Sequence, residues 1–113
     1  MAAEDSVSRL PDWKQIYKAF KRFAHCDDGT IAEGFTESVV HLLATQWETL
    51  PQVASLESKN GEFLNFVLRH IDGSTDTSEL KRIAHLARTQ CPTGHSLMCS
   101  AIFQAAAGGT NTP

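Results

Sequence analysis

Helical periodicity runs through almost the whole chain after Pro11, and it constrains the fold more than any other feature of the sequence. Between residues 13 and 24 the apolar side chains recur three and four residues apart, while three lysines and Arg22 fall between them. This spacing places the apolar side chains on one face of an amphipathic helix and the cations on the other. No segment shows the convincing alternating pattern of a half-buried strand, so the sequence predicts an all-α fold.

Helix-starting and helix-stopping residues divide the chain into six helical segments. Asp12 can cap the first helix, and Asp76 followed three residues later by Glu79 has the spacing of a capping box. Pro92 is predicted to break one helix, and Thr93 to cap the next. The predicted helices span residues 12–24, 28–47, 49–60, 62–71, 76–91 and 93–108. Short helices with short links favour a compact antiparallel bundle of about five to six helices.

The composition is that of one small globular domain. The chain has 113 residues, of which 42% are apolar and 20% charged, so neither wholesale disorder nor a second domain is expected. We assign residues 11–109 to a single helical domain, 1–10 to a flexible N-terminus and 110–113 to a loose tail. No apolar stretch approaches the roughly 18 residues that span a bilayer.

Charge is distributed unevenly along the chain. The total is −3, which argues against a dedicated nucleic-acid binder. Residues 9–22 nevertheless carry +4, whereas residues 27–62 carry −6. Such asymmetry can steer a charged partner, or it can mean that oppositely charged helices face one another.

Three cysteines leave two readings of the redox state open. Cys91 and Cys99 would lie about 12 Å apart in one continuous helix, which is too far for a disulfide. A chain reversal at residues 92–94 would bring them together, and a bridge would indicate an oxidising compartment such as the periplasm. The alternative is three buried free thiols, including Cys26, in a cytosolic bundle. Metal binding through Cys91, His95 and Cys99 is not expected, because close cysteine pairs are absent.

No catalytic apparatus is visible in the sequence. There is no glycine-rich phosphate loop, nucleophile elbow or zinc-protease motif, and no EF-hand loop. Glu33 and Glu37 are explained by the acid-favouring start of a helix, and His70 by the end of one. We therefore expect neither an enzyme nor a cofactor. A thiol nucleophile at Cys26 ranks only as a third hypothesis, because no orienting motif accompanies it.

The first residues carry no export signal, since they lack a basic region and an apolar core. The stretch Ala2-Ala3-Glu4-Asp5 does resemble the residues found just after a small-residue cleavage site. We therefore consider a mature periplasmic chain with its signal peptide removed, and a cytoplasmic protein as the alternative.

Two segments carry a resemblance to a known group of proteins. Cys26-Asp27-Asp28-Gly29-Thr30-Ile31-Ala32-Glu33-Gly34-Phe35 and the stretch from Cys91-Pro92 to Cys99 resemble small exported helical proteins of bacteria. The nearest group is the periplasmic immunity proteins that neutralise type VI secretion peptidoglycan amidases. The resemblance is one of general character and size. It implies a small all-helical, disulfide-bonded and often dimeric domain that plugs the active-site groove of a toxin.

These observations favour a non-catalytic binding protein, an inhibitor that occludes the active site of a secreted cell-wall hydrolase. Polar turns between helices could enter such a cleft, although ordinary helix linkers have the same composition. The runner-up is a cytosolic helical adaptor or regulatory subunit, including a homodimer formed through exposed apolar surface. The turn residues that we predict to bind the partner are Ser58, Lys59, Asn60, Asp72, Gly73, Ser74, Thr75 and Asp76.

Overall fold

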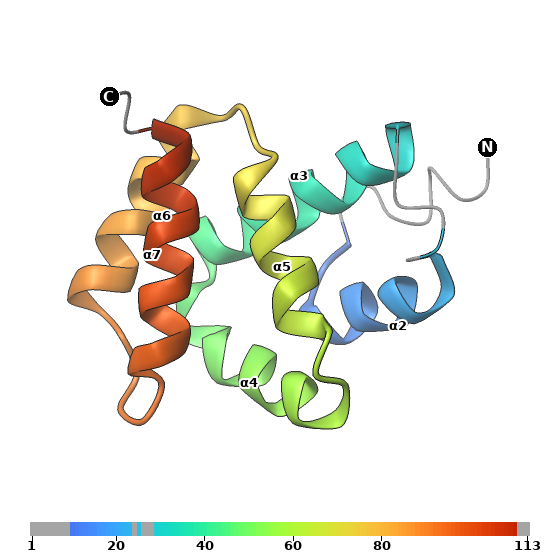
Figure 1. The fold of residues 1–113 in the computed structure, drawn as a ribbon, viewed down its shortest axis with the longest axis horizontal. Coiled ribbons are helices and arrows are strands. Elements are labelled where there is room, and N and C mark those ends of the chain that lie inside the picture. Colours follow the sequence, from blue (N-terminus) through green and yellow to red (C-terminus); the bar gives the residue numbers. More distant parts are fainter. Residues whose placement is uncertain (1–9, 24, 26–28, 111–113) are drawn as a thin grey trace.

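The described part of the chain consists of six α-helices and one short 3₁₀ helix. The computed structural model describes residues 10–23, 25 and 29–110, and no strand occurs among them. Figure 1 shows α6 and α7 side by side at one end of the molecule and α2 at the other, with α3 and α5 between them. The all-α prediction is confirmed. The elements are α2 (Trp13–Phe23), α3 (Gly29–Thr45), η2 (Trp47–Thr49), α4 (Leu50–Lys59), α5 (Phe63–Asp72), α6 (Thr77–Thr89) and α7 (Ser96–Thr110).

Two of the predicted helix caps, Asp12 and Asp76, are present. The Asp12 Oδ1 atom accepts a hydrogen bond from the Gln15 amide at 2.8 Å, and the Asp76 Oδ1 atom accepts one from the Glu79 amide at 3.0 Å. Each carboxylate thus satisfies an amide that has no partner inside its own helix. Asp28, a further candidate cap for the predicted helix that begins at residue 28, lies outside the described residues.

Two predicted boundaries around the last helix are wrong. Helix α7 begins at Ser96 rather than directly after Thr93. Gly94 adopts a left-handed φ of 88°, and the His95 amide bonds to the Pro92 carbonyl at 3.2 Å, so residues 92–95 form a turn. The helix also continues past Gly108 to Thr110. A glycine in a helix costs only about 1 kcal/mol, and the alanines before it favour continuation.

Two further predictions, one at Trp47 and one at Leu10, also differ from the structure. Trp47, the last residue of the predicted helix 28–47, belongs instead to η2, because α3 ends at Thr45. Leu10, predicted within the flexible N-terminus, packs partly buried against the core, and its amide donates to Ser38 Oγ at 3.0 Å. Residues 1–9 and 111–113 lie outside the described residues.

The centre of the core is a chain of aromatic rings around Phe66. Its ring centroid lies 4.8 Å from those of Phe20 in α2 and Phe35 in α3, and 4.7 Å from that of His70 in α5. Phe63 lies 5.4 Å from Phe20 and so extends the chain of rings. Tilted and edge-to-face pairs of this kind add roughly 0.5–1.5 kcal/mol beyond burial. The cluster therefore joins α2, α3 and α5.

Two tryptophan side chains form hydrogen bonds that connect η2 to neighbouring helices. Trp13 Nε1 donates to Thr49 Oγ1, and Trp47 Nε1 donates to the Gln90 carbonyl, both at 2.8 Å. Both indole rings are buried, so each N–H needs such a partner. These bonds hold the short connection between α3 and α4 against α2 and the end of α6.

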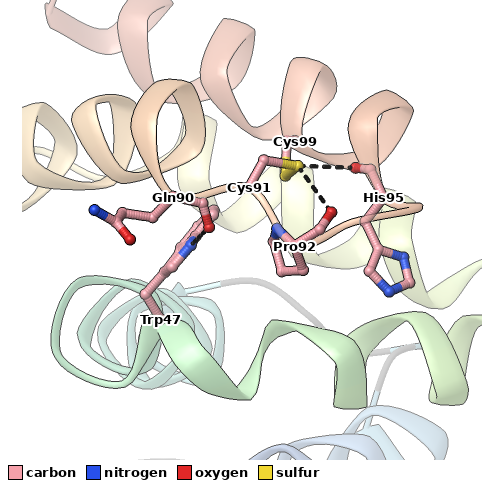
Figure 2. The surroundings of a disulfide bond; sticks show 6 residues. All are labelled: Trp47, Gln90, Cys91, Pro92, His95 and Cys99. Carbon is pink, nitrogen blue, oxygen red and sulfur yellow. Dashed lines mark hydrogen bonds between the residues drawn. A yellow bond between two sulfur atoms is a disulfide. The ribbon is translucent and has the colours of Figure 1, made fainter.

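A disulfide joins Cys91, just after α6, to Cys99 in the first turns of α7. The sulfur atoms are bonded, and the two Cα atoms lie 6.0 Å apart. The turn at residues 92–95 makes this possible, because it reverses the chain between the two helices. Figure 2 shows Cys91 Sγ beside the carbonyl oxygens of Pro92 and His95, at 3.5 and 3.4 Å. A bridged sulfur carries no hydrogen, so these are close contacts rather than hydrogen bonds.

The described helices also bear on the expectation about membranes. None of them is both long and apolar enough to cross a bilayer.

Reducing the disulfide should destabilise the fold. The bridge closes a short loop, since the cysteines are eight positions apart, and loop-closure entropy then gives a loss of about 2.5 kcal/mol. For a domain of this size we expect the melting temperature to fall by about 10–20 °C. Thermal unfolding followed by circular dichroism, with and without reductant, measures the change.

The matched control is the double variant Cys91→Ala/Cys99→Ala, whose melting temperature should not respond to reductant. Intact mass should show the native chain gaining two hydrogens on reduction. An identical melting curve for reduced and oxidised chains would contradict a stabilising role for the bridge.

Candidate functional site

The loop between α5 and α6 is hydrogen-bonded at both ends. The Gly73 amide donates to the Arg69 carbonyl and the Ser74 amide to the Ile71 carbonyl, at 3.0 and 3.1 Å. On the other side the Asp76 amide donates to Ser74 Oγ at 3.1 Å. The loop therefore presents a defined surface although it is short and polar.

This loop forms one wall of a surface cleft of about 560 Å³, and α3 forms the facing wall. Gly73 lies near the α3 wall, because a Cβ atom built there would be 3.9 Å from Thr36 Oγ1, an ordinary van der Waals contact. The residues that line the cleft are Ala32, Glu33, Thr36, Glu37, Val40, Arg69, His70, Gly73, Ser74, Thr75, Asp76 and Glu79.

Beneath the cleft a hydrogen bond ties α5 to α3. Thr36 Oγ1 and His70 Nδ1 lie 2.7 Å apart, and His70 is only 3% exposed. The distance alone would suit a nucleophile and its base. However, a threonine hydroxyl is a weak nucleophile, and this histidine ring is packed between Phe66 and Phe35. We therefore interpret the pair as a structural tie that holds the two walls of the cleft in register.

A second cleft, of about 530 Å³, adjoins the first along α3. Glu37, Asp76 and Glu79 line both clefts, so the clefts are adjacent, and we refer to them together as the acidic groove. With Glu33, four carboxylates line this groove, against the guanidinium of Arg69. With histidine neutral, the lining residues carry a net formal charge of −3, which suits a partner surface that projects a basic side chain.

Glu79 sits where the two clefts meet. Its side chain is 29% exposed, and its Oε2 atom lies 3.6 Å from His41 Nδ1. Burial raises the pKa of the Glu79 carboxyl, and the neighbouring Asp76 charge raises it further, while His41 acts in the opposite direction. Ionised Glu79 is therefore less favourable in the folded chain than in water.

In the predicted binding turn at residues 72–76, four residues border the groove and one does not. Gly73, Ser74, Thr75 and Asp76 line the first cleft. Asp72 is the last residue of α5 and lines neither cleft, so the structure places it beside the predicted surface rather than on it.

The other predicted binding turn, at residues 58–60, does not reach this groove. Residues 58–60 lie at the start of α5 and the loop 73–76 at its end, so one helix separates them. Ser58 Oγ donates to the Ser55 carbonyl at 2.6 Å, and Asn60 Oδ1 accepts from the Glu62 amide at 2.9 Å. Neither Ser58, Lys59 nor Asn60 lines either cleft. These bonds fit the role of a helix linker.

The α3 wall was missed by reasoning from the sequence. Glu33 and Glu37 were explained by their position near the start of a helix, although their spacing of four residues already placed them on one face. Nothing in the sequence around Thr36 marks it as a site residue, because its role depends on a hydrogen bond to His70, 34 residues later in the chain.

The described residues include no group of three or more histidine, cysteine, aspartate or glutamate side chains that could hold a metal ion. The Cys91 and Cys99 sulfurs are joined to each other and so are not available as thiolate ligands. Cys26, the candidate thiol nucleophile, lies outside the described residues. Comparison of the chain with protein-family models, curated proteins and solved structures gives no match.

Replacing Glu79 with glutamine should change the pH dependence of stability. Because folding raises this pKa, the folded chain holds the proton more tightly than the unfolded chain, and this contribution to stability is lost as the pH rises through the folded-state value. Glutamine remains neutral throughout. The free energy of unfolding of Glu79→Gln relative to the native chain should therefore increase between about pH 3.5 and about pH 7.

Denaturant unfolding at several pH values measures this difference. The control is Glu48→Gln, an exposed glutamate in η2. A constant difference between Glu79→Gln and the native chain across this range would show that burial does not penalise the Glu79 charge.

Proposed function

We propose that this protein is a non-catalytic inhibitor that binds a secreted peptidoglycan hydrolase and covers its active-site groove. The observation that carries the proposal is the hydrogen-bonded α5–α6 loop, largely exposed, which forms one wall of the acidic groove. A projecting loop can enter the cleft of an enzyme, while the groove beside it accepts a side chain from the rim of that cleft. The resemblance to amidase immunity proteins supports the same class of partner.

The hydrogen bonds within this surface favour tight binding because they preorganise it. Bonds on both sides of the loop, together with the Thr36–His70 tie beneath it, fix the surface before the partner arrives. Little conformational entropy is then lost on association. The acidic lining adds electrostatic attraction, which speeds the encounter with a basic surface and weakens with salt.

The disulfide supports an oxidising compartment, and we propose the periplasm. Such bonds persist in exported proteins and are rare in the cytosol, where thiols are kept reduced. The cytosolic adaptor, our alternative, is therefore the less favoured hypothesis. Trapping free thiols with an alkylating agent in intact cells separates the two, because Cys91 and Cys99 react without prior reduction only in a cytosolic protein.

The direct test is inhibition of the peptidoglycan hydrolase encoded beside this protein's gene. The purified chain should block release of soluble fragments from purified cell walls at one inhibitor per enzyme. Absence of such a neighbouring hydrolase, or undiminished hydrolysis at excess inhibitor, would contradict the proposal. Light scattering on the same samples tests the predicted homodimer.

The binding loop can be tested with a substitution that leaves its hydrogen bonds intact. Thr75 is exposed and lines the first cleft, whereas the Ser74 hydroxyl accepts a loop bond, so Thr75→Arg is the cleaner change. A bulky cation there should weaken inhibition at least about 10-fold, the effect of a lost central contact of about 1.4 kcal/mol. Isothermal titration with the hydrolase measures it.

Two further variants sharpen the result. His85→Arg adds the same charge on an exposed position of α6 outside both clefts and should leave the affinity unchanged. Lys59→Glu tests the predicted binding turn at residues 58–60. The Lys59 side chain is exposed and lies outside both clefts. Weakening by Lys59→Glu but not by Thr75→Arg would assign the interface to the α4–α5 turn instead.

A further inference from the structure

Helix α2 carries four exposed cations along one side. Lys14, Lys18, Lys21 and Arg22 are all exposed, and α2 contains no acidic residue. At 3.6 residues per turn these positions fall within an arc of about 100°, and they extend about 12 Å along the helix. We call these four residues the basic face.

The opposite side of α2 is fixed in the core. Trp13, Ile16, Ala19 and Phe20 are buried. The apolar residues of this amphipathic helix are therefore already used for folding, and the basic face is held on a rigid support. Any partner of this face has to be recognised by charge at the surface rather than by insertion of the helix.

No described carboxylate neutralises the basic face. None of the four side chains forms an ion pair with a described acidic residue, so the idea that oppositely charged helices face one another does not account for them. Two of them instead lie over aromatic rings: Lys21 Nζ is 5.3 Å from the Tyr17 ring centroid, and Arg22 Cζ is 5.1 Å from that of Phe23. These contacts support the stems of the side chains while the charged groups remain at the surface.

The rest of the molecule has the opposite charge. The basic face contributes +4 to a chain whose total is −3, so the remaining residues carry −7. A molecule with this separation of charge turns its basic face toward an anionic surface.

The shape of the basic face indicates which kind of anion it fits. The four cations lie on the side of α2 opposite its buried residues, which is the outward, convex side of the helix, and none of them lines either cleft. A convex row of charges suits a flat surface whose anions can move to meet each cation, as lipid headgroups do. We propose that the basic face is a docking surface for a membrane that contains anionic lipids. Each basic residue near such a surface adds about 5-fold to the affinity.

Sedimentation of the full chain with lipid vesicles tests this proposal. The chain should bind vesicles of phosphatidylcholine mixed with phosphatidylglycerol at about 20 mM salt and dissociate at about 500 mM, where the Debye length has become much shorter. Vesicles of phosphatidylcholine alone should not bind it. The double variant Lys14→Gln/Lys18→Gln should bind about 25-fold more weakly, since two cations are lost.

The matched control removes two lysines from elsewhere. Lys59 in α4 and Lys81 in α6 are exposed, and Lys59→Gln/Lys81→Gln should bind the anionic vesicles as the native chain does. Circular dichroism confirms that both double variants fold. Equal loss in the two variants, or equal binding to neutral vesicles, would overturn the proposal.

A second arm tests the competing class of anion. Single-stranded RNA of uniform sequence is titrated at the same salt concentrations. Tighter binding to that RNA than to the anionic vesicles would assign the basic face to nucleic acid and overturn the membrane proposal. The inference is independent of the proposed inhibition, because Lys14→Gln/Lys18→Gln leaves the α5–α6 loop and both clefts unchanged.

Discussion

The packing of Phe66 is the interaction on which the rest of this structure depends. Its ring contacts Phe20 in α2, Phe35 in α3 and His70 in its own helix, α5. Removing a fully buried phenylalanine costs about 3–5 kcal/mol, which is a large share of the stability of a small domain. This contact sets the positions of α2, α3 and α5, and the two surfaces with proposed functions are built on those helices.

The acidic groove follows directly from this arrangement. Once α3 and α5 are packed through Phe35 and Phe66, the Thr36–His70 bond forms near the end of α5 and brings the following loop against α3. The Asp76 cap then starts α6 directly after this loop. The negative charge of the groove then comes from residues that are far apart in the chain, such as Glu33 and Glu79.

The two proposed surfaces have opposite charges and require different partners. The basic face of α2 is convex and suits a flat anionic surface, whereas the acidic groove is concave and suits a projecting basic group. Both uses are compatible with one protein, since contact through α2 leaves the α5–α6 loop accessible. The disulfide between Cys91 and Cys99 fixes the far end of the molecule, which neither use requires to move.

The all-α fold and most helix ends could be predicted from the sequence because they depend on local physics. Apolar spacing, the Asp12 and Asp76 caps and the glycine stop at Gly73 all act within a few residues. The disulfide was one of two open readings, and it needed the left-handed turn at Gly94 to bring the cysteines together. The ends of α7 at Ser96 and Thr110 were not predicted. The turn at residues 92–95 delays the start of the helix, and the alanines before Gly108 favour its continuation through the glycines.

The candidate site was likewise only partly predictable from the sequence. Polar loop composition identified residues 72–76, but it also identified residues 58–60, and only tertiary packing distinguishes a loop that borders a groove from one that does not. The α3 wall depends on contacts across more than thirty residues, such as Thr36 with His70. The sequence by itself therefore determined which segments are helical and which faces are apolar. Which polar residues share one surface was decided by the tertiary structure, because that depends on how the buried rings pack.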